Sequence, residues 1–363
     1  MQLIFIAVIT STMISIIVSY IISLALIYIF VKYNIGHRVR LDGPSSHFQK
    51  CGTPPMGGIA IIASAWIGYM GICLINSISS IIEISTSSML VLSLTTVLGL
   101  VGFIDDLIKL WNSRSLGFTI KSKFLCQLTI SVIFSVLMVK SQNIDILSPS
   151  NIRLLNINDI ISVNIFSLVC IFIYTILISS WSNALNLTDG LDGLLVGLII
   201  IVSFSYVIII TWQYQHSCIA LINSKCYDLS NSSDLIILPS SVLGSCIGFL
   251  CWNSIPARIF MGDTGSLALG GLIAGLSIAS HTEILVIILG LTFVVEIVSV
   301  AIQIFTFRTI GYRFFRMTPL HHHFELCGWA ESRFTISLWL ITVLFSIFGL
   351  VLFYSEWLSI IMT

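Results

Sequence analysis

The chain has 363 residues, of which 57% are hydrophobic and only 9% are charged, and its formal net charge at pH 7 is zero. Soluble domains carry about 25% charged residues, so a chain this apolar is expected to be solvated mainly by lipid. The same composition excludes a nucleic-acid binder, which needs clustered basic surface, and a disordered chain, which needs low hydrophobicity. It predicts a polytopic membrane protein.

Ten stretches are long and apolar enough, or nearly so, to cross a bilayer as helices, which takes roughly 20 residues each. In chain order they are Leu3–Phe30, Met56–Ile75, Met89–Ile104, Phe124–Val139, Ile161–Trp181, Leu191–Trp212, Leu235–Trp252, Ser266–Ser280, Ile284–Phe305 and Phe334–Trp357. These runs are too long for barrel strands, which alternate over about 10 residues. We therefore predict an all-α fold of about ten transmembrane helices, with a single transmembrane domain over residues 1–363.

The cations are unevenly distributed over the connections between the predicted spans. The first, third, seventh and ninth connections hold 13 of the 16: Lys32, Arg38, Arg40, Lys50, Lys109, Arg114, Lys121, Lys123, Arg258, Arg308, Arg313, Arg316 and Arg333. The opposite face holds Lys140, Arg153 and Lys225. Because cytoplasmic loops carry the excess of Lys and Arg, the odd-numbered connections are predicted to be cytoplasmic and both termini periplasmic.

Acidic residues and histidines gather in the same cytoplasmic connections. Asp105 and Asp106 close the third span, and the other polar segments are 183–193, 253–266 and 319–325. Each segment alone has an ordinary interpretation, because paired aspartates cap helices, Asp-Gly pairs form turns and cations follow topology. Four of the five connections on one face share this character, however, and the outer face shows nothing similar. The active site is therefore predicted in the cytoplasmic loops.

Such a set of residues favours phosphoryl transfer. Carboxylates hold Mg²⁺, which binds one or two of them together with water and phosphate oxygens, and nearby cations neutralise the transferring group. Phe260 offers a stacking face for a planar base. A zinc site at His321–His323 is the nearest alternative from the spacing, although Zn²⁺ prefers three or four nitrogen or sulfur ligands.

At these residues the sequence resembles a known family nearly end to end. The matching elements are Lys50 with Gly52-Thr53-Pro54, Asp105-Asp106 with Lys123, Asn183–Gly193, Asn253–Leu267, and Phe315–Leu326 with its three histidines. They resemble the phospho-N-acetylmuramoyl-pentapeptide-transferases, in the polyprenyl-phosphate N-acetylhexosamine-1-phosphate transferase superfamily (glycosyltransferase family 4). Two positions depart from the usual pattern, with Pro55 in place of Thr and Cys327 in place of Lys.

The resemblance implies transfer of phospho-MurNAc-pentapeptide from UDP-MurNAc-pentapeptide to undecaprenyl phosphate. The products are lipid I and UMP, and the reaction requires Mg²⁺ at the bacterial inner membrane; a homodimer is left open. The implied metal ligands are Asp263, Asp105 and Asp106, which with His321 form the implied catalytic set. The implied substrate-binding residues are Lys50, Thr53, Lys109, Lys123, Asn186, Asp189, Asp192, Asn253, Phe260, His322 and His323.

Two other functions remain open at this point. A related enzyme would transfer GlcNAc-1-phosphate to the same lipid, and a secondary transporter would place its polar groups near the midplane. Glu296 is an ionisable residue in the middle of a predicted span, which marks it for function by default, although pairing with Gln303 is nearly as good an interpretation. Cys218 and Cys226 share an outer loop and could pair.

Overall fold

The computed structural model describes residues 2–36, 52–77, 84–111, 117–141, 163–217, 227 and 233–362. Within these ranges the chain is helical apart from an isolated bridge between Ser217 and Tyr227. The helices are α1 (Gln2–Lys32), α2 (Gly58–Ser77), α3 (Thr86–Trp111), α4 (Ile120–Ser141), α5 (Val163–Thr188), α6 (Leu194–Gln215), α7 (Ile237–Asn253), α8 (Gly262–Ala279), α9 (Leu285–Leu289), α10 (Leu291–Ile310), α11 (Leu320–Leu326) and α12 (Glu331–Met362). The predicted all-α fold is confirmed. Cys218 and Cys226, whose pairing the sequence left open, lie outside the described residues.

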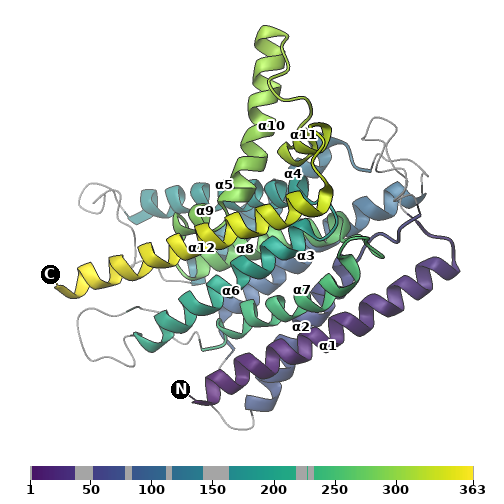
Figure 1. The fold of residues 1–363 in the computed structure, drawn as a ribbon. Helices are drawn as coiled ribbons and strands as arrows, with labels where there is room; N and C mark the ends of the chain where they lie inside the picture. The colour runs from purple at the N-terminus through teal and green to yellow at the C-terminus, as the bar shows by residue number, and fades with distance from the viewer. Residues whose placement is uncertain are drawn as a thin grey trace.

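The ten predicted spans all coincide with helices of the bundle in Figure 1. Nine helices in the described part of the chain are long and apolar enough to cross a membrane, and α7 falls just short with 17 residues. The ninth predicted span is wrong in one respect, because it is broken at Gly290 into α9 and α10. The ring of Trp181 lies where a Cβ on Gly290 would be, at 2.2 Å, so the indole packs into the break.

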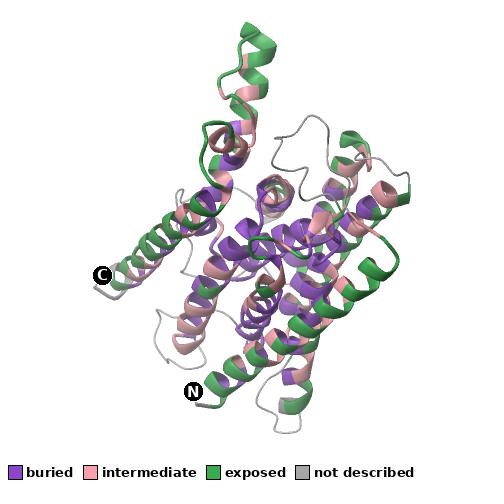
Figure 2. Cartoon of the chain, turned by 45° about the vertical axis from the view of Figure 1, so that its right-hand side comes forward, coloured by how far each residue is buried: buried purple, intermediate pink, exposed green. Residues whose placement is uncertain are grey.

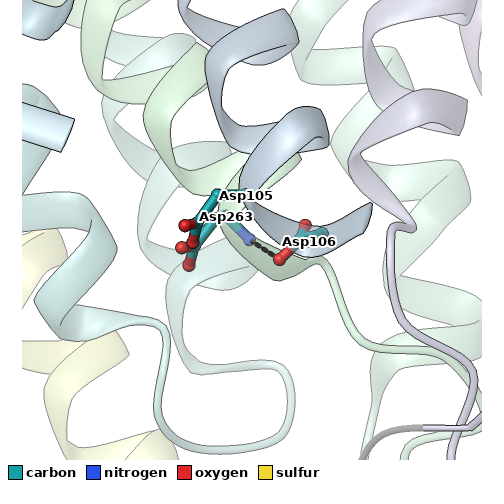
Figure 3. Close-up of side chains that lie close together, drawn as sticks. All are labelled: Asp105, Asp106 and Asp263. Atoms are coloured by element: carbon teal, nitrogen blue, oxygen red, sulfur yellow. Dashed lines mark hydrogen bonds between the residues drawn. The ribbon is translucent and has the colours of Figure 1, made fainter. Parts of the chain in front are cut away.

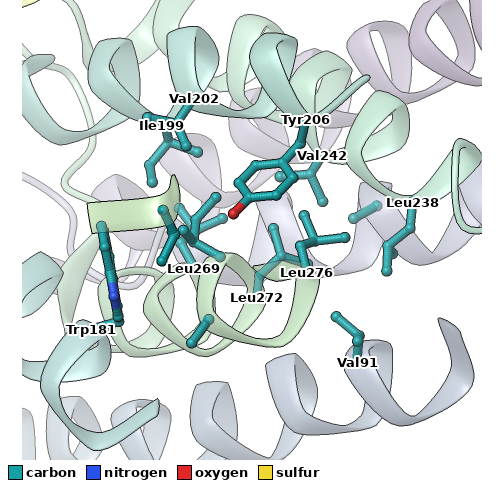
Figure 4. Packing of buried hydrophobic residues seen from close by; sticks show 14 of the residues in the cluster. Val91, Trp181, Ile199, Val202, Tyr206, Leu238, Val242, Leu269, Leu272 and Leu276 are labelled. Carbon is teal, nitrogen blue, oxygen red and sulfur yellow. The ribbon is translucent and has the colours of Figure 1, made fainter. Parts of the chain in front are cut away.

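Helix α8 lies at the centre of the bundle, where it packs against α3, α5 and α2. Every residue from Thr264 to Ala279 is buried. Leucines of α8 meet Val91 of α3 and Tyr206 of α6 in the apolar core (Figure 4). A Cβ on Gly102 of α3 would lie 2.1 Å from the carbonyl oxygen of Asp263, so the missing side chain lets α3 and α8 touch. This contact brings the ends of the two helices together.

Helix α10 stands apart from the other helices in both views of the molecule (Figures 1 and 2). Its distal side chains are apolar and exposed, with Phe305 at 67% and Ile310 at 74%. A soluble protein would bury such a surface, whereas hydrocarbon solvates it. Many of the exposed residues on the outer helices in Figure 2 are large and apolar, which also favours a lipid environment around the bundle.

Helix α1 packs against α7 and α2 through small residues. Its buried face carries a serine every fourth residue: Ser11, Ser15, Ser19 and Ser23. The Ser19 hydroxyl donates to the Ser245 carbonyl at 2.7 Å, and a Cβ on Gly248 would lie 2.4 Å from the carbonyl oxygen of Ile16. Small residues that let backbones approach, with hydroxyls bonding across the contact, are a common way for helices to associate in lipid.

Replacing Gly248 with valine is expected to destabilise the α1–α7 contact. The new side chain meets backbone rather than a flexible side chain, so the helices must separate, at a cost of about 1–3 kcal/mol. Thermal unfolding in detergent should therefore show a lower Tm. Gly71→Ala is the matched control, because nothing lies within 4 Å of a Cβ built there. Equal Tm values for the two variants would contradict the close contact.

Candidate active site

Three aspartates meet where the ends of α3 and α8 touch. Asp105 and Asp106 lie near the C-terminal end of α3, and Asp263 is the second residue of α8. Each offers a carboxylate oxygen, and the three oxygens lie within 4.8 Å of one another (Figure 3). Asp105 and Asp106 are 3% and 5% exposed. An oxygen-only cluster of this size fits a hard divalent cation.

Asp106 binds the first turn of α8 from the neighbouring helix. Its Oδ2 accepts hydrogen bonds from the Thr264 backbone N–H at 3.0 Å and from the Thr264 hydroxyl at 2.8 Å. Its Oδ1 accepts one from the Asp263 N–H at 3.3 Å, drawn dashed in Figure 3. Helix α8 has no capping side chain of its own, so Asp106 satisfies N–H groups that a helix leaves open at its start.

A glycine precedes this turn for a steric reason. Gly262 has a φ of +72°, a conformation that a side chain disfavours. A Cβ there would also lie 2.6 Å from Oδ2 of Asp106. The Gly-Asp-Thr sequence therefore aims two backbone N–H groups and one hydroxyl at Asp106, and this fixes the position of Asp263.

Asp263 is the centre of a network of charged hydrogen bonds. The ammonium groups of Lys109 and Lys123 each lie 2.7 Å from its Oδ2. The amide of Asn186 donates to its Oδ1 at 2.7 Å and to the Ser266 hydroxyl at 2.9 Å. All of these residues except Ser266 are predicted from the sequence. Four helices thus meet at one carboxylate, because Lys109 comes from α3, Lys123 from α4 and Asn186 from α5.

Asp105 uses both of its oxygens within this network. Oδ1 accepts the backbone N–H of Phe118, in the segment that leads into α4. Oδ2 lies 2.8 Å from the ammonium of Lys109 and 3.9 Å from that of Lys123. The two lysines therefore balance much of the negative charge of the aspartates.

The turn after α5 carries Asp189 and Asp192, which have different surroundings. Burial and the negative charges of Asp263 and Asp106 raise the pKa of Asp189 to about 8. Asp192 accepts the Ala257 N–H at 3.0 Å, while its own N–H donates to Glu331 at 2.8 Å. Asp189 thus feels the negative charge of the aspartate cluster. Asp192 instead connects the turn after α5 to the loop after α7 by a hydrogen bond.

Two other predicted binding residues also bond to backbone near this loop. Asn253 accepts the N–H of Gly193 at 3.1 Å and donates to the Ile259 carbonyl at 2.8 Å. The N–H of Phe260 donates to Pro54 and its carbonyl accepts from Gly57, both at 2.8 Å. These backbone hydrogen bonds hold the segment 54–57, which the half-buried Thr53 precedes, against the residues that lead into α8. Lys50 lies outside the described residues.

The three histidines of α11 contact three different partners. His321 is fully buried beside Glu296 of α10, with 3.4 Å between Nδ1 and Oε1. His322 Nδ1 lies 2.7 Å from Glu325, and His323 Nδ1 accepts the N–H of Arg316 at 3.2 Å. Within the described ranges the aspartate cluster is the one group of His, Cys, Asp and Glu ligands close enough for an ion, so the zinc alternative finds no support.

Glu296 and Glu331 are functional candidates that the sequence motifs do not place in the site. Of the two interpretations of Glu296, pairing with Gln303 is not the one observed, because the Gln303 amide instead binds both the N–H and the carbonyl of Phe315. The signal for Glu296 was an ionisable residue inside an apolar span. For Glu331 no local pattern separates it from an ordinary first-turn acid of α12.

Comparison with known proteins decides the family. The sequence model of Glycosyl transferase family 4 matches residues 88–281. The phospho-N-acetylmuramoyl-pentapeptide-transferase of Mycobacterium avium (strain 104) is 47% identical over 344 residues, which cover 95% of this chain and 96% of that protein. This chain belongs to the phospho-N-acetylmuramoyl-pentapeptide-transferase family. The enzymes of that name from Mycobacterium tuberculosis (strain ATCC 25618 / H37Rv) and Mycolicibacterium smegmatis are each 47% identical over 342 residues, covering 94% of this chain and 95% of theirs.

Membership in the transferase family sets aside the transporter alternative. The glycosyl transferase match includes all but the first two residues of α3 and the whole of α5 and α8, which together supply the aspartate cluster and Asn186. It ends before α11, so the histidines lie beyond it. The long alignments with the transferases cover 95% and 94% of this chain. The resemblance stated from the motifs is thereby confirmed at the level of the whole chain.

Proposed function

We propose that this protein transfers phospho-MurNAc-pentapeptide from UDP-MurNAc-pentapeptide to undecaprenyl phosphate, forming lipid I and releasing UMP. The observation that carries the proposal is the near full-length similarity to transferases of that name. The aspartate–lysine cluster at one end of the bundle supports it, because phosphoryl transfer needs positioned cations and carboxylates. A soluble donor and a lipid acceptor can meet at such an end, where the bundle reaches the bilayer surface.

The proposed setting follows from the same arrangement. The chain acts as one transmembrane transferase domain over residues 1–363, in the bacterial inner membrane, with the aspartate cluster cytoplasmic and both termini periplasmic. Whether the chain forms a homodimer is left open, and light scattering of the detergent-solubilised protein decides it.

Mg²⁺ is the proposed cofactor, held by Asp263 with Asp105 and Asp106, where it would neutralise the phosphates of the donor. Lys109 and Lys123 supply two further positive charges at Asp263, and Asn186 orients that carboxylate. These residues act by position and charge, which is the usual basis of phosphoryl transfer. His321, with its buried ring, completes the proposed catalytic set.

The remaining predicted residues form the proposed donor-binding surface. Asp189 and Phe260 flank the cluster, with Phe260 as the stacking face for uracil, and Asp192 and Asn253 hold the two loops together. Lys50, Thr53, His322 and His323 are proposed to contact the donor at its edge.

Purified protein with undecaprenyl phosphate and UDP-MurNAc-pentapeptide tests the function directly. We expect UMP release and lipid I formation with Mg²⁺ and neither product with chelator, with recovery on adding Mg²⁺. UDP-GlcNAc is offered in a parallel reaction. Exclusive use of UDP-GlcNAc would replace the proposal with GlcNAc-1-phosphate transfer, and the absence of UMP from both donors would overturn both functions.

Asp105 is proposed to organise metal and phosphate rather than to remove a proton. The acceptor is a phosphate monoester with a second pKa near 6, so at neutral pH little proton is left for a general base. Both Asp105 oxygens are also engaged by Phe118 and Lys109. We expect the rate of Asp105→Asn to stay low from pH 6 to 9. A steep recovery at high pH would support the base role instead.

Asp189 predicts a pH dependence of nucleotide binding. With its pKa raised to about 8, the carboxyl is neutral at pH 7 in the substrate-free protein and ionises as the pH rises through 8. The new negative charge repels an anionic nucleotide, so the affinity for UMP in metal-free buffer should fall by up to about tenfold per pH unit above 8. Asp189→Asn stays neutral and should flatten this part of the profile. Calorimetric titration of both proteins measures it, and equal slopes would contradict the assignment.

A further inference from the structure

Glu296 is a buried carboxylate in α10, away from the aspartate cluster, and it binds α11. It is 2% exposed, and its Oε2 accepts the backbone N–H of Leu320 at 2.7 Å. Leu320 is the first residue of α11, and the residue before it, Pro319, offers no capping side chain. Glu296 thus caps α11 from a neighbouring helix and holds the short helix in place.

The other oxygen of Glu296 faces His321. The distance from Oε1 to Nδ1 is 3.4 Å, a close polar contact rather than a formed hydrogen bond, between two side chains that are almost completely buried. A carboxylate only accepts hydrogen bonds, so it favours the forms of the imidazole that carry a proton on Nδ1. In a neutral histidine, the group that accepts a hydrogen bond from one ring nitrogen decides that this nitrogen carries the proton.

The far nitrogen of His321 points at the turn after α5. A Cβ built on Gly190 would lie 2.2 Å from Nε2, so the ring fits only because this position is glycine. Both ring nitrogens are buried without a hydrogen bond among the described residues; Nδ1 has the Glu296 carboxylate 3.4 Å away, which leaves Nε2 as the nitrogen for another partner. An unsatisfied buried nitrogen is costly. Its place beside Asp189, on the side of the proposed donor surface, indicates that its partner belongs to the substrate.

We propose that Glu296 is a positioning residue that acts through His321. It anchors the start of α11 and keeps the Nδ1 proton in place, so that Nε2 faces the substrate at the Asp189–Gly190 turn. The inference rests on the proposed function. It also accounts for an acid in an apolar helix, where a charge is expensive unless it is paired.

A double-mutant cycle tests the proposal, with kcat and KM for UDP-MurNAc-pentapeptide as readouts. Glutamine at 296 has one acceptor oxygen, so its NH₂ must face either Leu320 N–H or His321 Nδ1. We expect Glu296→Gln to lower kcat about 100-fold, the low end for general acid–base groups, with KM changed less than threefold. In the His321→Ala background the same substitution should change kcat less than threefold, because the group through which it acts is gone.

Gln303→Leu is the matched control. It removes the hydrogen bonds between Gln303 of α10 and Phe315 in the segment before α11, and it leaves the contacts of His321 unchanged. Its effect on kcat should be the same factor in both backgrounds. If Glu296→Gln is not recovered from membranes, Glu296→Asp replaces it: the shorter carboxylate cannot reach both partners, and at least a tenfold loss of kcat, again absent with His321→Ala, is expected.

Three results separate the hypotheses. Active wild type with unchanged kcat in the Glu296 variant overturns the positioning role and leaves the proposed function standing. Equal losses of kcat with and without His321 overturn it as well, because Glu296 then acts only on the fold. Wild type that makes no UMP or lipid I counts against the proposed function itself.

Discussion

Asp263→Asn is expected to lower the rate of lipid I formation by about 10³-fold, the scale seen when a principal electrostatic group is removed. The carboxylate accepts from two ammonium groups and one amide, each at 2.7 Å. Asparagine removes the negative charge and turns an NH₂ donor toward these donors. Both the hold on the divalent cation and the placement of Lys109 and Lys123 should therefore be lost. Initial rates of UMP release at saturating Mg²⁺ measure the effect, and Mn²⁺ titration followed by electron paramagnetic resonance measures cation binding.

Ser266→Ala is the matched control for this experiment. Ser266 belongs to the same network and lies in the same helix turn, but its hydroxyl makes only neutral hydrogen bonds: it accepts from Asn186 at 2.9 Å and donates to the Gly262 carbonyl at 3.1 Å. We expect a loss of less than tenfold, in keeping with about 1 kcal/mol for such a bond. If Asp263→Asn kept a tenth of the wild-type rate with unchanged Mn²⁺ affinity, Asp263 would not be the centre of the site.

The sequence predicts the helices well over their apolar, membrane-spanning parts, and less well at their ends. The third span was expected to end at Ile104, whereas α3 continues to Trp111. Hydropathy stops at Asp105 because charged residues follow, but those residues remain helical because they bind α8 and the start of α4. Tertiary contacts thus extend a helix beyond its apolar core.

The break at Gly290 has a different origin. The run from Ile284 to Phe305 has its first charged residue at Glu296, beyond the break, so apart from Gly290 itself no local signal separates α9 from α10. The separation depends on Trp181, more than 100 positions earlier, which packs where a Cβ would be. A single glycine in such a run is compatible with either a continuous helix or a broken one, and the folded bundle shows that the helix is broken here.

Which residues form the candidate site was easier to predict than which partner each of them contacts. Charge placement and motif resemblance brought out the three aspartates and Lys109, which the fold collects at one point. The individual partners could not be predicted, because contacts such as Thr264 with Asp106 join residues 158 positions apart. Ser266 and Glu331 have no distinguishing pattern in the sequence. Their contacts with Asn186 and with the Asp192 N–H in the folded chain identify them as part of the site.

Asp106→Asn is expected to lower the rate about 100-fold for a reason different from Asp263→Asn. Asp106 accepts hydrogen bonds from Asp263 N–H and from both donors of Thr264, so its main task is to hold the start of α8. An amide leaves one of these N–H groups facing an NH₂, which displaces Asp263. We therefore expect a lower Tm and a smaller loss of Mn²⁺ affinity than in Asp263→Asn.

Thr264→Val provides the comparison that separates capping from metal binding at Asp106. Valine removes the hydroxyl that donates at 2.8 Å but keeps the backbone N–H, so about 1 kcal/mol of stability should be lost with a rate loss of tenfold or less. When it is combined with Asp106→Asn, little further Tm decrease is expected, because the hydroxyl and the carboxylate form one interaction. A normal Tm for Asp106→Asn together with complete loss of Mn²⁺ binding would instead make Asp106 chiefly a metal ligand. Because the same carboxylate faces both α8 and the metal cluster, stability and cation affinity must be measured on the same preparation.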